Sequence, residues 1–149
     1  MTTKIYTENL SQPSRAVLAY CSLENIPVEI VNIRIDKLEN RTPDYKKISG
    51  TGKVPALSDE LTDGTTFTMF ESHAIIRYLA DRYNKSTLYP RSNIQLKGIV
   101  DSYLDWHHTN TRKCAPYLFA LYFAPTFGLK MEIDEKKSLE EIRVALSFI

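Results

Sequence analysis

The sequence has 149 residues, enough for one ordinary domain or two small ones, and 43% of them are hydrophobic against 25% charged. The net charge is +1, from 19 basic and 18 acidic residues without a long run of one sign, so nucleic acid is not expected as the main partner. No apolar stretch approaches the roughly 18 residues that suggest a membrane-spanning helix, so no membrane span is expected.

The N-terminus has no apolar core typical of a secretory signal, and Glu8, with no arginine before Arg15, does not fit a transit peptide. Cys21 and Cys114 lie far apart and form no C-x-x-C motif, which favours two reduced, packed thiols. We therefore expect a cytoplasmic protein, with membership of an organellar complex as the alternative.

The first segments predict a strand followed by a helix. Residues 4–7 are a strand candidate, and after a polar turn Pro13 suits the first turn of a helix. Ser11 therefore lies at a strand-to-helix junction. The predicted apolar stripe of this helix consists of Ala16, Val17, Tyr20 and Leu23.

The next segments predict a second strand and a second helix. Residues 28–35 are rich in β-branched residues and predict a buried strand. Residues 37–48 predict a weaker helix, interrupted by Pro43. A loop, residues 49–52, then leads to Lys53.

The stretch from Lys53 to Tyr83 predicts a strand, a turn, a second strand and a helix. Asp63-Gly64 is a hairpin signal, and residues 67–70 are rich in aromatic and β-branched residues. Ser72 is the expected N-cap of the helix. The apolar face of that helix consists of Ala74, Ile75, Ile76, Leu79, Ala80 and Tyr83.

Two features of this stretch suit a small anionic ligand. The Val54-Pro55 bond has a cis penalty of only about 0.5–1 kcal/mol, and a cis bond would leave the backbone of Val54 facing outward, unpaired by the sheet. The helix start at Ser72 favours a carboxylate by about 0.3–1 kcal/mol. An ordinary hairpin followed by a capped helix explains the same features without a ligand.

The order of these elements predicts the fold class. Two strands joined through a helix are parallel, and the hairpin adds an antiparallel pair. The result is an α/β, thioredoxin-like domain over residues 1–84, with a mixed four-stranded sheet in the order βαβ-α-ββα.

After Tyr83 the composition changes. Residues 85–92, with lysine, serine, proline and arginine, are the expected linker, and residues 93–149 predict an all-helical domain. One long helix is expected to kink at Pro116, and its apolar face consists of Leu96, Val100, Tyr103, Leu104, His107, Thr111, Ala115, Leu118 and Tyr122. Another amphipathic helix begins near Leu139, and its apolar pattern runs to Ile149 and needs a partner.

The histidines do not predict a metal site. His107 and His108 are adjacent on the predicted helix, about 100° apart, so they cannot share one metal ion as residues four apart could. We expect packing or surface histidines there and at His73, and no metal.

Four segments resemble the glutathione transferase family, most closely its theta class. They are LSQPSRAVLAY at residues 10–20, KVPAL at 53–57, ESHAIIRYLADRY at 71–83 and VDSYLDWHHTNTR at 100–112. KVPAL and the E-S pair are shared across the superfamily, whereas the S-Q-P turn and the last segment point to theta. The resemblance implies a thioredoxin-like domain followed by an all-helical one. Residues 93–149 supply only its first helices, so we expect either residues after Ile149 or a natural truncation.

The resemblance also assigns roles to residues of the first domain. Ser11 matches the catalytic serine, whose hydroxyl donates to the glutathione sulfur. Val54 would pair its backbone with the cysteinyl part of glutathione, beside cis-Pro55. Glu71 would meet the α-amino group, and Ser72 with the helix start would hold the γ-glutamyl carboxylate.

Further positions are assigned in the same way. Lys53 would face the glycine carboxylate, and Asn40 matches a position where theta-class members commonly carry histidine near that carboxylate. Arg112 matches an arginine that reaches the site from the helical domain, and Gln12 follows the catalytic position. Glutathione is the implied co-substrate, and the implied second substrate is a small hydrophobic electrophile such as an alkyl halide or peroxide.

Three functions stay open. The first is an enzyme that conjugates glutathione, since serine at position 11 argues against the reductase chemistry of cysteine-bearing relatives. The second is a non-catalytic glutathione transferase-like subunit that docks into a larger assembly. The third is a carrier of apolar ligands. The resemblance further implies a homodimer.

Overall fold

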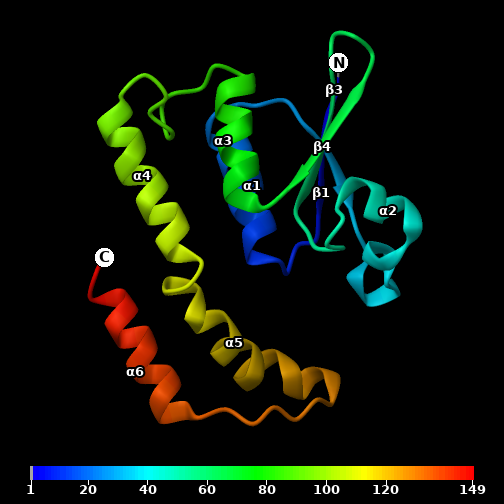
Figure 1. Ribbon diagram of the computed structural model, residues 1–149. Helices are drawn as coiled ribbons and strands as arrows, with labels where there is room; N and C mark the ends of the chain where they lie inside the picture. Colours follow the sequence, from blue (N-terminus) through cyan, green and yellow to red (C-terminus); the bar gives the residue numbers. More distant parts are fainter. Residues whose placement is uncertain (1) are drawn as a thin grey trace. The chain divides into compact units, whose positions relative to one another are not determined.

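The chain divides into two compact units, Met1–Lys97 and Gly98–Ile149, and the computed structural model describes residues 2–149 (Figure 1). The first unit holds a β-sheet with helices, and the second is helical. The segment predicted as a linker contains Tyr89, which is buried. The predicted boundaries at residues 85–92 stay a prediction.

A mixed four-stranded sheet forms the centre of the first unit, as the sequence predicts. Its strand order is β2-β1-β3-β4, with β1 parallel to β2 and β3 antiparallel to both neighbours. The strands are β1 (Thr3–Thr7), β2 (Glu29–Asn32), β3 (Ala56–Glu60) and β4 (Thr66–Phe70). This topology, with the helices between the strands, is thioredoxin-like and confirms the predicted fold class.

Helices cover both faces of this sheet. α1 (Gln12–Leu23) and α3 (Ser72–Arg82) contact each other on one face, and α2 (Pro43–Ile48) contacts β3 and β4 from the other (Figure 1). Apolar side chains from both strands and helices are fully buried, which places the core between the sheet and these helices. They include Ile5, Val17, Leu57, Ile75 and Leu79.

The apolar stripe of α1 differs from the prediction, because Val17 and Tyr20 are buried but Ala16 is only half-buried and Leu23 is exposed. Leu23 is 69% exposed, and the buried face consists of Ser14, Val17, Tyr20 and Cys21. Leu23 lies two residues beyond Cys21, which turns it about 200° around the helix and into solvent.

The predicted buried strand at residues 28–35 is wrong in length and in burial. β2 has only four residues, and Ile30 is 52% exposed. The reason is its place at the edge of the sheet, where one side of the strand has no neighbouring strand. Ile33, just after the strand, is the residue that reaches the core.

The predicted weak helix at residues 37–48 is also corrected. Two short 3-10 turns, Ile35–Lys37 and Glu39–Arg41, are separated by Leu38 at φ 59. Pro43 begins α2 instead of interrupting a helix, because the first helical position needs no backbone N–H.

The second unit is helical, but the single kinked helix is wrong. A turn at residues 108–110 ends α4 well before Pro116, which lies inside α5. The helices are α4 (Ile94–His107), which begins in the first unit, α5 (Cys114–Leu118) and α6 (Glu135–Leu146), with a π-helical turn at Phe119–Phe123. α6 confirms the last predicted helix, and Asp134 caps it by accepting from the Lys137 N–H at 2.9 Å.

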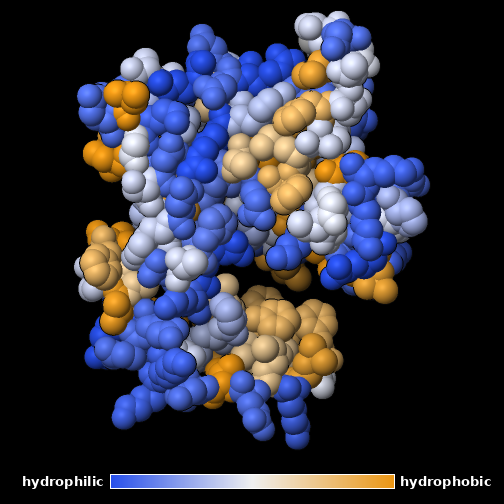
Figure 2. Space-filling model, viewed as in Figure 1, coloured by the Kyte–Doolittle hydropathy of each residue, from blue (hydrophilic) through white to orange (hydrophobic). Residues whose placement is uncertain are grey.

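Many large apolar side chains of the second unit are exposed (Figure 2). They include Leu118, Phe119, Leu121, Tyr122, Phe123 and Phe127. Within residues 2–149, no helix combines the length and apolar character needed to cross a bilayer.

A hydrogen-bonded cluster around the buried carboxylate of Asp59, in the first unit, has no counterpart among the sequence predictions. Asp59 on β3 accepts hydrogen bonds from the Thr3 hydroxyl at 2.6 Å, the Tyr78 hydroxyl at 2.6 Å and Arg82 Nε at 2.8 Å. Burial by itself would raise the pKa of Asp59. The three hydrogen bonds and the charge of Arg82 outweigh burial and hold that pKa below its usual value. The cluster therefore ties β1 and β3 to α3 through an ionised carboxylate.

We expect the Cys21 thiol to resist alkylation in the folded protein. It is buried in α1, and burial raises its pKa to about 11, so little thiolate forms near neutrality. In a Cys114→Ser variant, in which Cys21 is the only thiol, iodoacetamide at neutral pH should react slowly in buffer and fully in denaturant. Equal rates under the two conditions would contradict this burial.

Candidate functional site

Several connecting segments meet at one end of the first sheet, the lower end in Figure 1. β1 and β4 end there and β3 begins there, because Tyr6 pairs with Ala56 and Ala56 pairs with Phe70. α1 follows β1 from this end, and α3 follows β4. The register therefore brings the segments that carry Ser11, Val54-Pro55 and Glu71-Ser72 to the same end of the sheet, with the N-termini of α1 and α3 beside them.

Ser11 caps α1, as its predicted place at a strand-to-helix junction suggests. Its backbone is extended, with φ −72 and ψ 110, and its hydroxyl oxygen accepts from the Ser14 N–H at 3.4 Å. A serine hydroxyl that accepts in this way still has its proton to donate. Gln12, the first helical residue, is exposed. The cap therefore leaves one hydrogen-bond donor at the helix start for a ligand.

The predicted cis bond between Val54 and Pro55 is confirmed. It lies directly before β3, where the chain enters the sheet. The Val54 side chain packs against the buried cluster of Ile33, Tyr45 and Ala56. This packing anchors Val54 at the candidate site.

The start of α3 differs by one residue from the prediction. Glu71, and not Ser72, is the N-cap residue, and it has the unusual backbone angles φ 75 and ψ 115. A residue at positive φ cannot be helical, so the helix begins with Ser72, which is buried. The Ser72 N–H is therefore one of the free N–H groups at the helix start.

The backbone of Glu71 stores strain that the sequence does not reveal. A non-glycine residue in such a region costs on the order of 1–3 kcal/mol, and such strain concentrates at functional sites. We expect a Glu71→Gly variant to be more stable than a Glu71→Ala variant by about 1 kcal/mol, because only glycine relieves the positive φ. Urea unfolding of both variants measures the difference, and an alanine variant of equal or greater stability would contradict the strain.

Hydrogen bonds hold the loop that carries Lys53, and one of them comes from Asn40 in the 3-10 turn Glu39–Arg41. Asn40 is buried, and its Nδ2 donates to the Gly52 carbonyl at 2.8 Å. The Lys53 side chain is exposed, whereas its carbonyl accepts from the Tyr45 hydroxyl at 2.9 Å and from Ser49 Oγ at 3.0 Å. Tyr45 and Ser49 lie outside every motif of the sequence, so no sequence signal could have selected them.

Arg112 belongs to the second unit, in a 3-10 turn at Thr111–Lys113, and its contribution to a site stays a prediction. The pKa of the nearby His107 is lowered, mainly by burial of its ring. The positive charges of Arg112 and His108 lower this pKa further. Within the described chain, no three histidine, cysteine or acidic side chains lie in an arrangement that could hold a metal ion.

Comparison with known proteins finds a matching family model for the first unit. Residues 11–82 match the family model "Glutathione S-transferase, N-terminal domain". Glutathione S-transferase T2 of Arabidopsis thaliana is 36% identical over 145 residues, which cover 95% of this chain and 24% of that protein.

Solved structures agree with the sequence match. The apo form of human glutathione-S-transferase T1-1 has a TM-score of 0.84 at 31% identity and covers 98% of this chain. A human theta-class transferase in complex with the glutathione conjugate of 1-menaphthyl sulfate has a TM-score of 0.85 at 28% identity and covers 99%. The chain spans 60% and 59% of those two chains, so it covers less than two thirds of each relative's length.

Proposed function

Because the chain belongs to the glutathione S-transferase superfamily and is similar to its theta class, we propose that it binds glutathione and activates the thiol as a thiolate. The thiolate then attacks a small hydrophobic electrophile. The observation that carries this proposal is the meeting of three features at one sheet end: the hydroxyl of Ser11, the cis bond at Pro55 and the strained Glu71 before α3.

The start of α3 suits the charged groups at the γ-glutamyl end of glutathione. In the proposal, Ser72 and the N-terminus of α3 hold the γ-glutamyl carboxylate, because free N–H groups and the helix dipole favour an anion there. The carboxylate of Glu71 meets the α-amino group. These two contacts fix the γ-glutamyl end.

The other end of glutathione lies along the loop before β3. The backbone of Val54 pairs with the cysteinyl residue, and the exposed Lys53 faces the glycine carboxylate. Gln12 and Asn40 flank this part of the proposed site, and Arg112 is the proposed contribution of the second unit.

Ser11 acts on the sulfur. Its hydroxyl donates a hydrogen bond to the thiolate, and the N-terminus of α1 adds a favourable potential. The thiol proton leaves to solvent, and the sulfur attacks the electrophilic carbon of an alkyl halide. A carbon–sulfur bond forms, and the halide departs with the electron pair of its bond.

The test is a conjugation assay with glutathione and an alkyl halide. The proposal predicts halide release above the uncatalysed rate, saturation with increasing glutathione, and the thioether as the product in mass spectrometry. Absence of both turnover and calorimetric glutathione binding would overturn it.

The exposed apolar side chains of the second unit support a second candidate, a non-catalytic subunit that docks into a larger assembly. Glutathione binding without turnover, together with co-purification of a partner, would favour this candidate. A cytoplasmic location and a homodimer are further parts of the main proposal.

A further inference from the structure

The backbone carbonyls just before Val54 are held by three buried side chains. The Lys53 carbonyl accepts from the hydroxyls of Tyr45 and Ser49, at 2.9 Å and 3.0 Å. The preceding Gly52 carbonyl accepts from Asn40 Nδ2 at 2.8 Å. All three donor residues are at least nine-tenths buried, so water does not replace these bonds easily.

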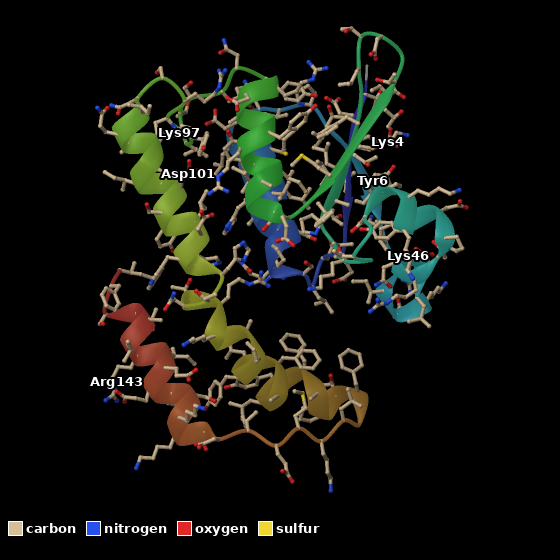
Figure 3. The ribbon with its side chains drawn as sticks, in the orientation of Figure 1. Lys4, Tyr6, Lys46, Lys97, Asp101 and Arg143 are labelled. Atoms are coloured by element: carbon tan, nitrogen blue, oxygen red, sulfur yellow. The ribbon has the colours of Figure 1, made fainter. Side chains whose placement is uncertain are left out.

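The packing around these bonds leaves little freedom. Gly52 has φ +65, and a Cβ at this position would lie 2.8 Å from the Asn40 carbonyl oxygen, so only glycine fits. The Tyr45 ring packs edge-on against Tyr6 with ring centroids 6.0 Å apart, and the Tyr6 side chain lies between the sheet and α2 (Figure 3). The packed Tyr45 ring therefore holds the Tyr45 hydroxyl in place.

The fixed carbonyl sets the direction of the next N–H group. The Lys53 carbonyl and the Val54 N–H belong to one trans peptide plane, in which the two groups point in opposite directions. Because the carbonyl points to Tyr45 and Ser49, the Val54 N–H points away from them. The side chain of Val54 is held as well, since it packs on the cluster that contains Tyr45.

We propose that Tyr45, Ser49 and Asn40 are positioning residues that orient the Val54 backbone toward the cysteinyl part of glutathione. This inference rests on the proposed function and deepens it, because it assigns the affinity for glutathione partly to two residues outside the proposed contacts, Tyr45 and Ser49. Pre-organised backbone groups lose less freedom on binding, which raises affinity. Burial raises the pKa of Tyr45 to about 12, so its hydroxyl stays a donor over the working pH range.

A pair of tyrosine variants separates positioning from general packing. Tyr45→Phe keeps the ring and removes the hydrogen bond to Lys53. Tyr20→Phe is the matched control, because Tyr20 is equally buried, at 5% exposure, and its hydroxyl has no hydrogen-bond partner within residues 2–149. The readouts are the KM and Kd for glutathione, the kcat at saturating glutathione, and the Tm.

The inference predicts that Tyr45→Phe raises both KM and Kd about fivefold to tenfold, the factor expected for one hydrogen bond. The kcat at saturating glutathione should stay close to that of Tyr20→Phe. Adding Ser49→Ala removes the second bond to the same carbonyl and should raise KM and Kd further. Ser49→Ala alone provides a milder change if the double variant folds poorly.

Two results would overturn the inference. One is an unchanged KM and Kd in Tyr45→Phe and in Ser49→Ala, in a protein whose wild type binds glutathione. The other is an equal rise in both tyrosine variants accompanied by an equal fall in Tm, which would indicate packing alone. A wild type that fails to bind glutathione contradicts the proposed function itself, and this inference with it.

Discussion

Replacing Ser11 with alanine is expected to lower kcat/KM for conjugation by about 10- to 150-fold, because a hydrogen bond to a charged acceptor contributes about 1.5–3 kcal/mol. A free cysteine thiol has a pKa of about 8.5, and ionising it near neutrality requires a shift of about two units, or roughly 2.7 kcal/mol. In the proposed mechanism the Ser11 hydroxyl supplies most of this free energy, and the N-terminus of α1 adds about 0.3–1 kcal/mol. The pKa of the bound thiol, followed by thiolate absorbance, should therefore rise in the variant.

Two controls separate this effect from the loss of a helix cap. Ser11→Thr keeps both the hydroxyl and the cap and should retain most of the activity. Ser22→Ala changes an exposed serine on the same helix and should leave kcat/KM and the thiol pKa unchanged. If Ser11→Ala matches wild type in both quantities, Ser11 is not the group that stabilises the thiolate.

Replacing Asp59 with asparagine is expected to lower the free energy of unfolding by about 3 kcal/mol. Breaking a buried ion pair typically costs about 3–5 kcal/mol, and the value here falls at the lower end because the Arg82 side chain is 31% exposed. In a unit of this size the Tm should fall by about 12–24 °C, which a thermal melt measures.

The matched control is Asp44→Asn. The Asp44 carboxylate also pairs with a cation, Lys47 at 2.7 Å, but its side chain is 90% exposed. Exposed pairs contribute little, so the Tm of this variant should equal that of wild type. A melting temperature of Asp59→Asn that also equals wild type would show that the buried cluster does not stabilise the fold.

The same carboxylate predicts how stability depends on pH. The pKa of Asp59 is lower in the folded than in the unfolded chain, so its contribution is present above the unfolded value of about 4. The contribution is lost as the pH falls through the folded pKa. The Tm difference between wild type and Asp59→Asn should therefore narrow from about pH 7 to about pH 3, and a constant difference over this range would contradict the assignment.

The sheet of the first unit was predictable because its signals are local. Asp63-Gly64 marks the hairpin, and the period of the α3 segment marks the helix. Edge position is not a local property, so the β-branched run around Ile30 looks the same whether the strand is buried or exposed. Asp59 illustrates the same limit, since Thr3 and Arg82 lie far from it in sequence.

The parts of the site that resisted prediction depend on backbone geometry. The positive φ of Glu71 arises where β4 turns into α3, and glutamate does not signal it.

In the second unit, the end of α4 carries no glycine or proline. The Asn110 side chain donates to the Trp106 carbonyl at 2.8 Å, so an amide takes the place of the backbone N–H that would continue the helix.

A calorimetric titration of the wild-type chain with glutathione tests the central claim most directly, when it is repeated below pH 8 in buffers of different ionisation enthalpy. The account predicts saturable binding with the release of about one proton per glutathione, because the thiol ionises as it binds. Absence of heat at millimolar glutathione, or binding without proton release, would contradict it.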